Sequence, residues 1–135
     1  MDLIKRLRER YSVERVELRL DANGAFPVEE AFERLRRLAP YDIHSIEQPI
    51  RPGRWDAMAN LCRTSPIPIA LDEELIGVNR INDKIRLLDV VQPQYIILKP
   101  SLHGGFSGCK EWETLADERS IALWHTSALE SNVGL

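Results

Sequence analysis

The sequence contains little that points to a disulfide-stabilised, nucleic-acid-binding or membrane-spanning protein. Its two cysteines, Cys62 and Cys109, have no C-x-x-C spacing, which favours reduced thiols over a disulfide framework or a zinc site. The formal net charge of -3, with no long run of Lys or Arg, indicates no basic surface for nucleic acid. No apolar run reaches membrane-spanning length and no signal-peptide pattern is present, so a cytoplasmic location is expected.

The composition is that of an ordinary globular protein of single-domain size. The 135 residues are 44% hydrophobic and 29% charged. Apolar alternation predicts strands at 13–21, 41–50, 67–72, 93–100 and 121–128. Helical periodicity predicts a helical face at 4–11, helices at 26–40, 53–64, 80–91 and 107–120, and the start of another helix after residue 129. This alternation predicts an α/β fold with a parallel sheet covered by helices.

Three consecutive acids, residues 72–74, directly follow an apolar strand. The simplest interpretation is a solvated loop, because unpaired charge is costly to bury. However, polar residues recur at the ends of the predicted strands at intervals of 25 to 27 residues, namely Asp21, Glu47, Asp72, Lys99 and the pair Thr126 and Ser127. One strand and one helix of a (β/α)₈ barrel have about this length, and such barrels carry their sites at these strand ends. The spacing therefore predicts one shared site.

The types of residue in this pattern indicate a divalent cation. Carboxylates from neighbouring strands repel one another unless a cation lies between them. Oxygen ligands alone suit Mg²⁺, and no His or Cys lies in phase with them, which disfavours zinc. Lys99 would place positive charge beside that site, to stabilise an anion or carry a proton. Glu73 is expected to hold neighbouring groups in place. In the following loop, His103 is either a structural histidine or a group that approaches a substrate.

Four short motifs resemble the muconate-lactonizing branch of the enolase superfamily. They are Asp21-Ala-Asn23, Glu47-Gln48-Pro49, Asp72-Glu73 and Lys99-Pro100. The longer stretches "DANGAF", "SIEQPI", "ALDEELIG", "YIILKPSLHGGFSG" and "TSALESNVGL" resemble, more narrowly, the o-succinylbenzoate synthase family. The resemblance implies a partial (β/α)₈ TIM-type barrel with about five βα units.

The resemblance also implies a role for each candidate residue. Asp21, Glu47 and Asp72 would bind Mg²⁺, with Mn²⁺ as a possible substitute. Lys99 would be catalytic and would stabilise charge on the substrate face opposite the main base. Asn23 and Glu73 would support the metal ligands, and Thr126 and Ser127 would contact a carboxylate of a small-molecule substrate. The implied activity is that of a dehydratase that forms o-succinylbenzoate in menaquinone biosynthesis, through an enediolate that the metal stabilises.

The chain departs from this family in ways that limit the expected activity. Members are longer and carry an N-terminal cap and a Lys-x-Lys strand that have no counterpart in residues 1–135. We therefore expect a fragment of the barrel domain, without the cap, the first strands and the last strand, that is inactive alone. Five strands leave two open edges, which favours self-association. Alternatives are another activity of the branch, such as dipeptide epimerisation or cycloisomerisation, or a non-catalytic fragment that self-associates.

Overall fold

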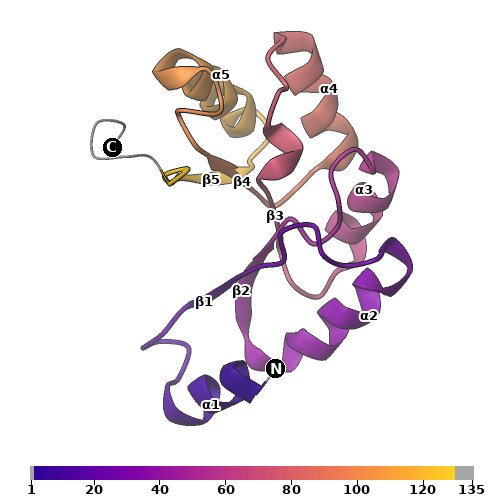
Figure 1. Ribbon diagram of the computed structural model, residues 1–135, viewed down its shortest axis with the longest axis vertical. Helices are drawn as coiled ribbons and strands as arrows, with labels where there is room; N and C mark the ends of the chain where they lie inside the picture. The colour runs from indigo at the N-terminus through magenta and orange to yellow at the C-terminus, as the bar shows by residue number, and fades with distance from the viewer. Residues whose placement is uncertain (1, 130–135) are drawn as a thin grey trace.

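The computed structural model describes residues 2–129, in which strands and helices alternate (Figure 1). The helices are α1 Asp2–Arg10, α2 Val28–Leu38, α3 Trp55–Thr64, α4 Ile81–Val91 and α5 Gly105–Asp117, with short 3₁₀ turns η1 Ala39–Tyr41 and η2 Glu73–Leu75. The strands are β1 Leu18–Asp21, β2 Ile43–Glu47, β3 Ile69–Leu71, β4 Tyr95–Leu98 and β5 Ala122–His125. The predicted order of elements is confirmed, and the helix predicted after residue 129 lies outside the described residues.

The five strands form one parallel sheet in the order β1-β2-β3-β4-β5. Each of the strands β1 to β4 is followed by a helix, and α2 to α5 lie in an arc around the outer side of the sheet (Figure 1). Parallel strands in sequential order place all their carboxyl ends at one edge. The predicted α/β class and the partial barrel of about five βα units are therefore confirmed.

Contacts between the two outer strands show that the sheet is curled. The guanidinium of Arg19 in β1 lies 4.3 Å from the ring centroid of Trp124 in β5. In a flat sheet these strands would be about 19 Å apart, because neighbouring strands are spaced by about 4.8 Å. The two side chains meet because they both point to the concave side of a half-barrel.

The hydrophobic core lies between the outer face of this half-barrel and the helices. Its largest fully buried side chain is Trp112 of α5, and the central strand β3 is buried along its whole length. Helices α2 to α5 contribute buried apolar side chains to this core, including Ala31, Leu35, Met58, Leu61, Leu87, Leu88, Leu115 and Ala116. Burial of β3 and of most of β4 explains why these central strands read as near-continuous apolar runs, whereas β1 and β5 are only partly buried.

Several predicted boundaries differ from the observed ones, and three of them are informative. The first strand begins at Leu18 rather than at residue 13, because the Ser12 carbonyl accepts the N–H groups of Arg15 and Val16 and closes a turn. The second strand ends at Glu47, because Gln48 has a φ of 37°, in the left-handed region. The last described helix begins at Gly105, two residues before the predicted start.

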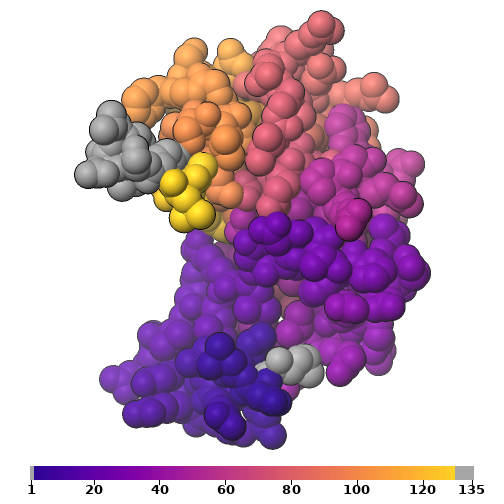
Figure 2. Space-filling model, viewed as in Figure 1, coloured from indigo at the N-terminus to yellow at the C-terminus, as the bar shows by residue number. Residues whose placement is uncertain are grey.

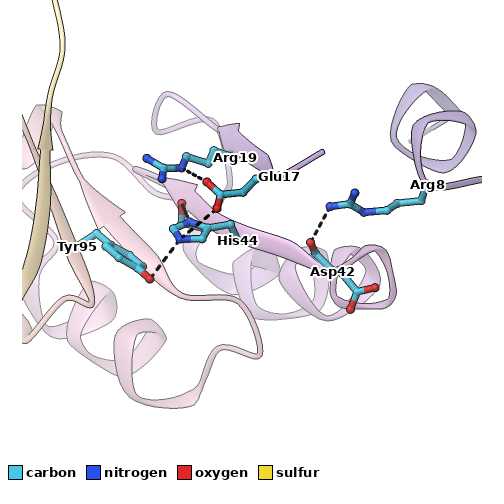
Figure 3. A network of polar contacts seen from close by, with 7 residues as sticks. Arg8, Glu17, Arg19, Asp42, His44 and Tyr95 are labelled. Atoms are coloured by element: carbon cyan, nitrogen blue, oxygen red, sulfur yellow. Dashed lines mark hydrogen bonds and ion pairs between the residues drawn. The ribbon is translucent and has the colours of Figure 1, made fainter. Parts of the chain in front are cut away.

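A polar network lies at the amino-terminal end of the sheet (Figure 3). The register of β1 on β2 shifts between Leu18 and Arg19, so His44 has no ladder partner on β1. The His44 ring contacts Ser45 through Nδ1 at 3.0 Å and the Tyr95 hydroxyl through Nε2 at 3.4 Å. These contacts support a structural role for His44.

None of the helices in the described part of the chain is long and apolar enough to cross a membrane.

Candidate active site

The predicted charged residues lie at one end of the sheet, as their spacing indicates. Asp21 and Glu47 are the last residues of β1 and β2, and their Cα positions are partners in the ladder. Asp72 and Lys99 directly follow β3 and β4. The parallel sheet thus brings three carboxylates and one ammonium group from four neighbouring strands to a single edge.

The ion pair between Asp72 and Lys99 dominates the charge distribution at this edge. Asp72 is 1% exposed, and its Oδ2 accepts a hydrogen bond from Nζ of Lys99. Burial acts to lower the pKa of Lys99, but the hydrogen bond and charge of Asp72, with the charges of Glu47 and Glu73, raise it overall. Lys99 therefore carries a positive charge beside the carboxylates.

Glu47 and Glu73 bind protons more readily than free carboxyls do. Burial, followed by the side chain of Asp72 and the charge of Asp21, raises the pKa of Glu47 to about 8. Burial, followed by the charges of Asp72 and Asp21, also raises the pKa of Glu73. Carboxylates that lie this close raise one another's pKa unless further positive charge lies between them.

The donor atoms at this edge fit a divalent cation. Asp72 Oδ1 and Glu73 Oε2 are buried, and within residues 2–129 they have no hydrogen-bond partner. Oxygen donors of this kind suit Mg²⁺ or Mn²⁺ better than Zn²⁺. In the described chain, however, no three carboxylate, His or Cys side chains already stand close enough to form a metal cluster. Lys99 takes up one oxygen of Asp72, so the assignment of Asp21, Glu47 and Asp72 as metal ligands stays a prediction.

Asn23 contacts a candidate ligand through its backbone. Its N–H donates to Oδ1 of Asp21 at 2.7 Å, and its φ of 48° turns the chain sharply after β1. This contact orients the exposed Asp21 carboxylate. Thr126 and Ser127 follow β5 and are exposed, and the Thr126 N–H donates to the Leu98 carbonyl at 2.9 Å. Their hydroxyls lie at the predicted end of the sheet, and their contact with a substrate stays a prediction.

Sequence reasoning missed a buried clamp formed by Gln48 and Glu74. Gln48 Oε1 accepts the N–H groups of Asp72 and Glu74, at 3.3 and 3.2 Å. Gln48 Nε2 donates to Glu74 Oε2 at 3.1 Å and to the Ile50 carbonyl at 3.0 Å. Glu74 Oε1 accepts the Gly53 N–H at 2.7 Å. The third acid of the run is therefore structural, and it joins the loops that follow β2 and β3.

His103 does not reach the surface. Its side chain belongs to a residue that is 3% exposed, and its Nδ1 accepts the N–H of Lys99 at 2.9 Å. Burial is the largest factor that lowers the pKa of His103. This burial agrees with a structural role for His103 and not with contact to a substrate.

Comparison with known proteins identifies the family of this half-barrel. The family model described as "Enolase C-terminal domain-like" matches residues 1–135. The chain belongs to this family. Membership agrees with the parallel half-barrel and with the polar edge that the motifs predicted.

Individual members of the enolase C-terminal domain-like family are similar over nearly the whole chain. An o-succinylbenzoate synthase from Desulfotalea psychrophila is 54% identical over 98% of this chain and 36% of its own length. A D-Ala-D/L-Ala epimerase from Cytophaga hutchinsonii is 29% identical over 88% of this chain and 32% of its own. The crystal structure of MenC from Desulfotalea psychrophila has a TM-score of 0.95 and 53% identity, over 98% of this chain and 37% of that one. The chain thus spans about a third of the length of these relatives.

Proposed function

We propose that residues 1–135 carry the metal-binding and lysine-bearing part of an o-succinylbenzoate synthase, a carbon–oxygen lyase of menaquinone biosynthesis. The observation that carries this proposal is the Asp72–Lys99 pair at the edge that also holds Asp21 and Glu47. The 54% identity with the Desulfotalea psychrophila enzyme supports the choice of reaction. The substrate would be a cyclohexadiene carboxylate with a succinyl side chain, which loses water.

Each residue of the edge has a defined task in this proposal. Asp21, Glu47 and Asp72 would hold Mg²⁺, which when bound supplies positive charge against the charge that develops on the substrate carboxylate. The ammonium of Lys99 would lie on the opposite face and add a second positive charge there. Thr126 and Ser127 would orient the substrate carboxylate by hydroxyl or backbone N–H groups.

We expect this half-barrel to show no dehydratase turnover by itself. The five described strands form an open half-barrel, and the surface is hollowed on one side between its first and last parts (Figure 2). Water then reaches the reacting groups and weakens each electrostatic interaction.

A chimera tests the function directly. Residues 1–135 would replace the matching third of the Desulfotalea psychrophila synthase, and turnover of the cyclohexadiene substrate would be measured with Mg²⁺. We expect activity near that of the parent enzyme. Lys99→Ala should lower kcat by about 10³-fold or more, and Lys99→Arg should restore only part of it, because guanidinium keeps the charge but not the compact shape. An exposed control, Lys110→Ala, should leave kcat unchanged. A folded chimera without turnover, or one insensitive to Lys99→Ala, would refute the proposal.

A second candidate is epimerisation of a dipeptide, favoured by the similarity to the D-Ala-D/L-Ala epimerase. The same metal edge and Lys99 would serve that reaction, since it too starts with removal of a proton next to a carboxylate. The chimera would be assayed with D-Ala-L-Ala as well. Epimerisation that exceeds dehydration in kcat/KM would select this alternative.

A further inference from the structure

The backbone on either side of Lys99 is fixed by a compact turn. The Lys99 carbonyl accepts the N–H groups of Leu102 and His103, at 2.8 and 3.1 Å. The Pro100 carbonyl accepts the N–H of Gly105 at 2.8 Å. On the other side, the Lys99 N–H donates to Nδ1 of His103 at 2.9 Å. His103 thus binds both backbone polar groups of Lys99.

The direction of this last hydrogen bond determines the protonation state of the ring. A backbone N–H can only donate, so Nδ1 of His103 must accept and carries no proton. The neutral ring then has its proton on Nε2. That nitrogen is buried and has no hydrogen-bond partner within residues 2–129. Burial disfavours a second proton on the ring, in agreement with the lowered pKa of His103.

Close packing of α5 against the backbone of His103 limits movement of the loop that carries it. A Cβ atom on Gly108 would lie 1.8 Å from the His103 carbonyl oxygen, so only glycine allows α5 to approach this closely. From α4, the buried Lys84 donates to Glu111 Oε2 at 2.8 Å and to the Gly108 carbonyl at 3.4 Å. The loop that carries His103 therefore packs closely against α5, and Lys84 in turn joins α5 to α4.

We propose that His103 is a positioning residue, which holds the backbone of Lys99 through an unprotonated Nδ1 and so directs the lysine ammonium towards Asp72. The chemical importance of Lys99 rests on the proposed function, whereas the tautomer and the hydrogen bond do not. A short side chain that places an acceptor at the position of Nδ1 should preserve the hydrogen bond from the Lys99 N–H. An apolar side chain of similar size should lose it.

NMR spectroscopy of the chain tests the hydrogen bond without reference to activity. Long-range ¹H–¹⁵N spectra at neutral pH should show a pyridine-type Nδ1 and a pyrrole-type Nε2 for His103. The Lys99 amide should exchange with solvent about tenfold faster in His103→Leu, which corresponds to about 1.4 kcal/mol for the lost hydrogen bond. In His103→Asn, whose Oδ1 can accept the same N–H, the exchange rate should stay within about threefold of the wild type. His125→Leu changes an exposed histidine and should leave this amide unaffected.

Two results would overturn the proposal. One is a proton on Nδ1, which can be observed in the wild type even if His103→Leu does not fold. The other is a Lys99 amide that exchanges equally fast in wild type, His103→Asn and a folded His103→Leu. In the chimera, His103→Leu should lower kcat by about 10- to 100-fold with little change in KM, and His103→Asn should retain kcat. Loss of the predicted tautomer refutes the positioning role alone, whereas insensitivity of kcat to Lys99→Ala refutes the proposed function alone.

Discussion

Individual residues of the acidic run have different tasks, although the sequence presents them as three equal carboxylates. Asp72 pairs with Lys99, Glu73 keeps a buried oxygen without a hydrogen-bond partner in the described chain, and Glu74 accepts hydrogen bonds from Gln48 and Gly53. Specific polar partners thus offset the cost of burying charge for Asp72 and Glu74. The contribution of the Gln48–Glu74 clamp to stability can be measured by substitution.

Gln48→Glu should lower the free energy of unfolding by about 2–4 kcal/mol, because two carboxylates would then face each other in a buried site. Urea unfolding followed by circular dichroism measures this change. The double variant with Gln48→Glu and Glu74→Gln should recover part of the loss, since one donor then stands between the two side chains again. If the double variant is no more stable than Gln48→Glu alone, the clamp does not act through this hydrogen bond.

Glu47 should make metal binding depend on pH. Its pKa of about 8 lies above the ordinary value of 4.5, so the folded chain holds the extra proton between these values. The free energy of unfolding therefore falls as pH rises through this window. A cation must displace the proton, so Mg²⁺ affinity should rise by up to about tenfold per pH unit and level off above about 8.

Isothermal titration calorimetry across this pH range measures the effect. Glu47→Gln should weaken binding and flatten the pH dependence, and the exposed control Glu33→Gln should retain it. An affinity for Mg²⁺ that does not change with pH would show that Glu47 is not among the ligands.

At the scale of elements, helix α1 is attached mainly through one arginine. The Arg8 guanidinium donates to the carbonyls of Tyr41 and Val16, at 2.8 and 2.6 Å, and to that of Asp42 at 3.0 Å. The contact with Asp42 is drawn in Figure 3. Arg8→Lys provides one point charge for three acceptors and should release α1, with a loss of about 1–3 kcal/mol. Faster amide exchange confined to α1 would confirm this, and the exposed Arg6→Lys is the control. Unchanged exchange in α1 would contradict it.

The sequence predicted the elements well where one physical rule dominates. The buried central strands β3 and β4 read as apolar runs, and the polar strand ends at Asp21, Glu47 and Asp72 follow from the repeat of βα units. The left-handed conformation of Gln48, which ends β2, depends on side-chain hydrogen bonds to residues 24 and 26 positions away, and no local pattern encodes it. The same holds for His103, whose burial and hydrogen bond with the Lys99 N–H follow from packing that no local pattern encodes.

At the scale of the whole molecule, the described half-barrel has two open sheet edges. Strands β1 and β5 have ladder partners on one side only, and large apolar residues near the polar edge are exposed, among them Phe106 at 88% and Ile76 at 43%. We expect self-association that increases with concentration, because unpaired edges and apolar patches bind one another. Sedimentation velocity at several concentrations measures it, and Phe106→Lys should reduce it. A monomer at all concentrations would contradict this expectation.

The claim that three strand ends hold one divalent cation is tested most directly with Mn²⁺. A Mn²⁺ titration of ¹⁵N-labelled chain should broaden the amide signals of residues 21, 47, 72 and 73 first and saturably, because paramagnetic relaxation falls steeply with distance from the ion. Excess Mg²⁺ should restore these signals, and Asp72→Asn should abolish the broadening while the fold remains. Broadening that is centred instead on the exposed acids Glu29, Glu30 and Glu33 of α2, or that never saturates, would contradict the account.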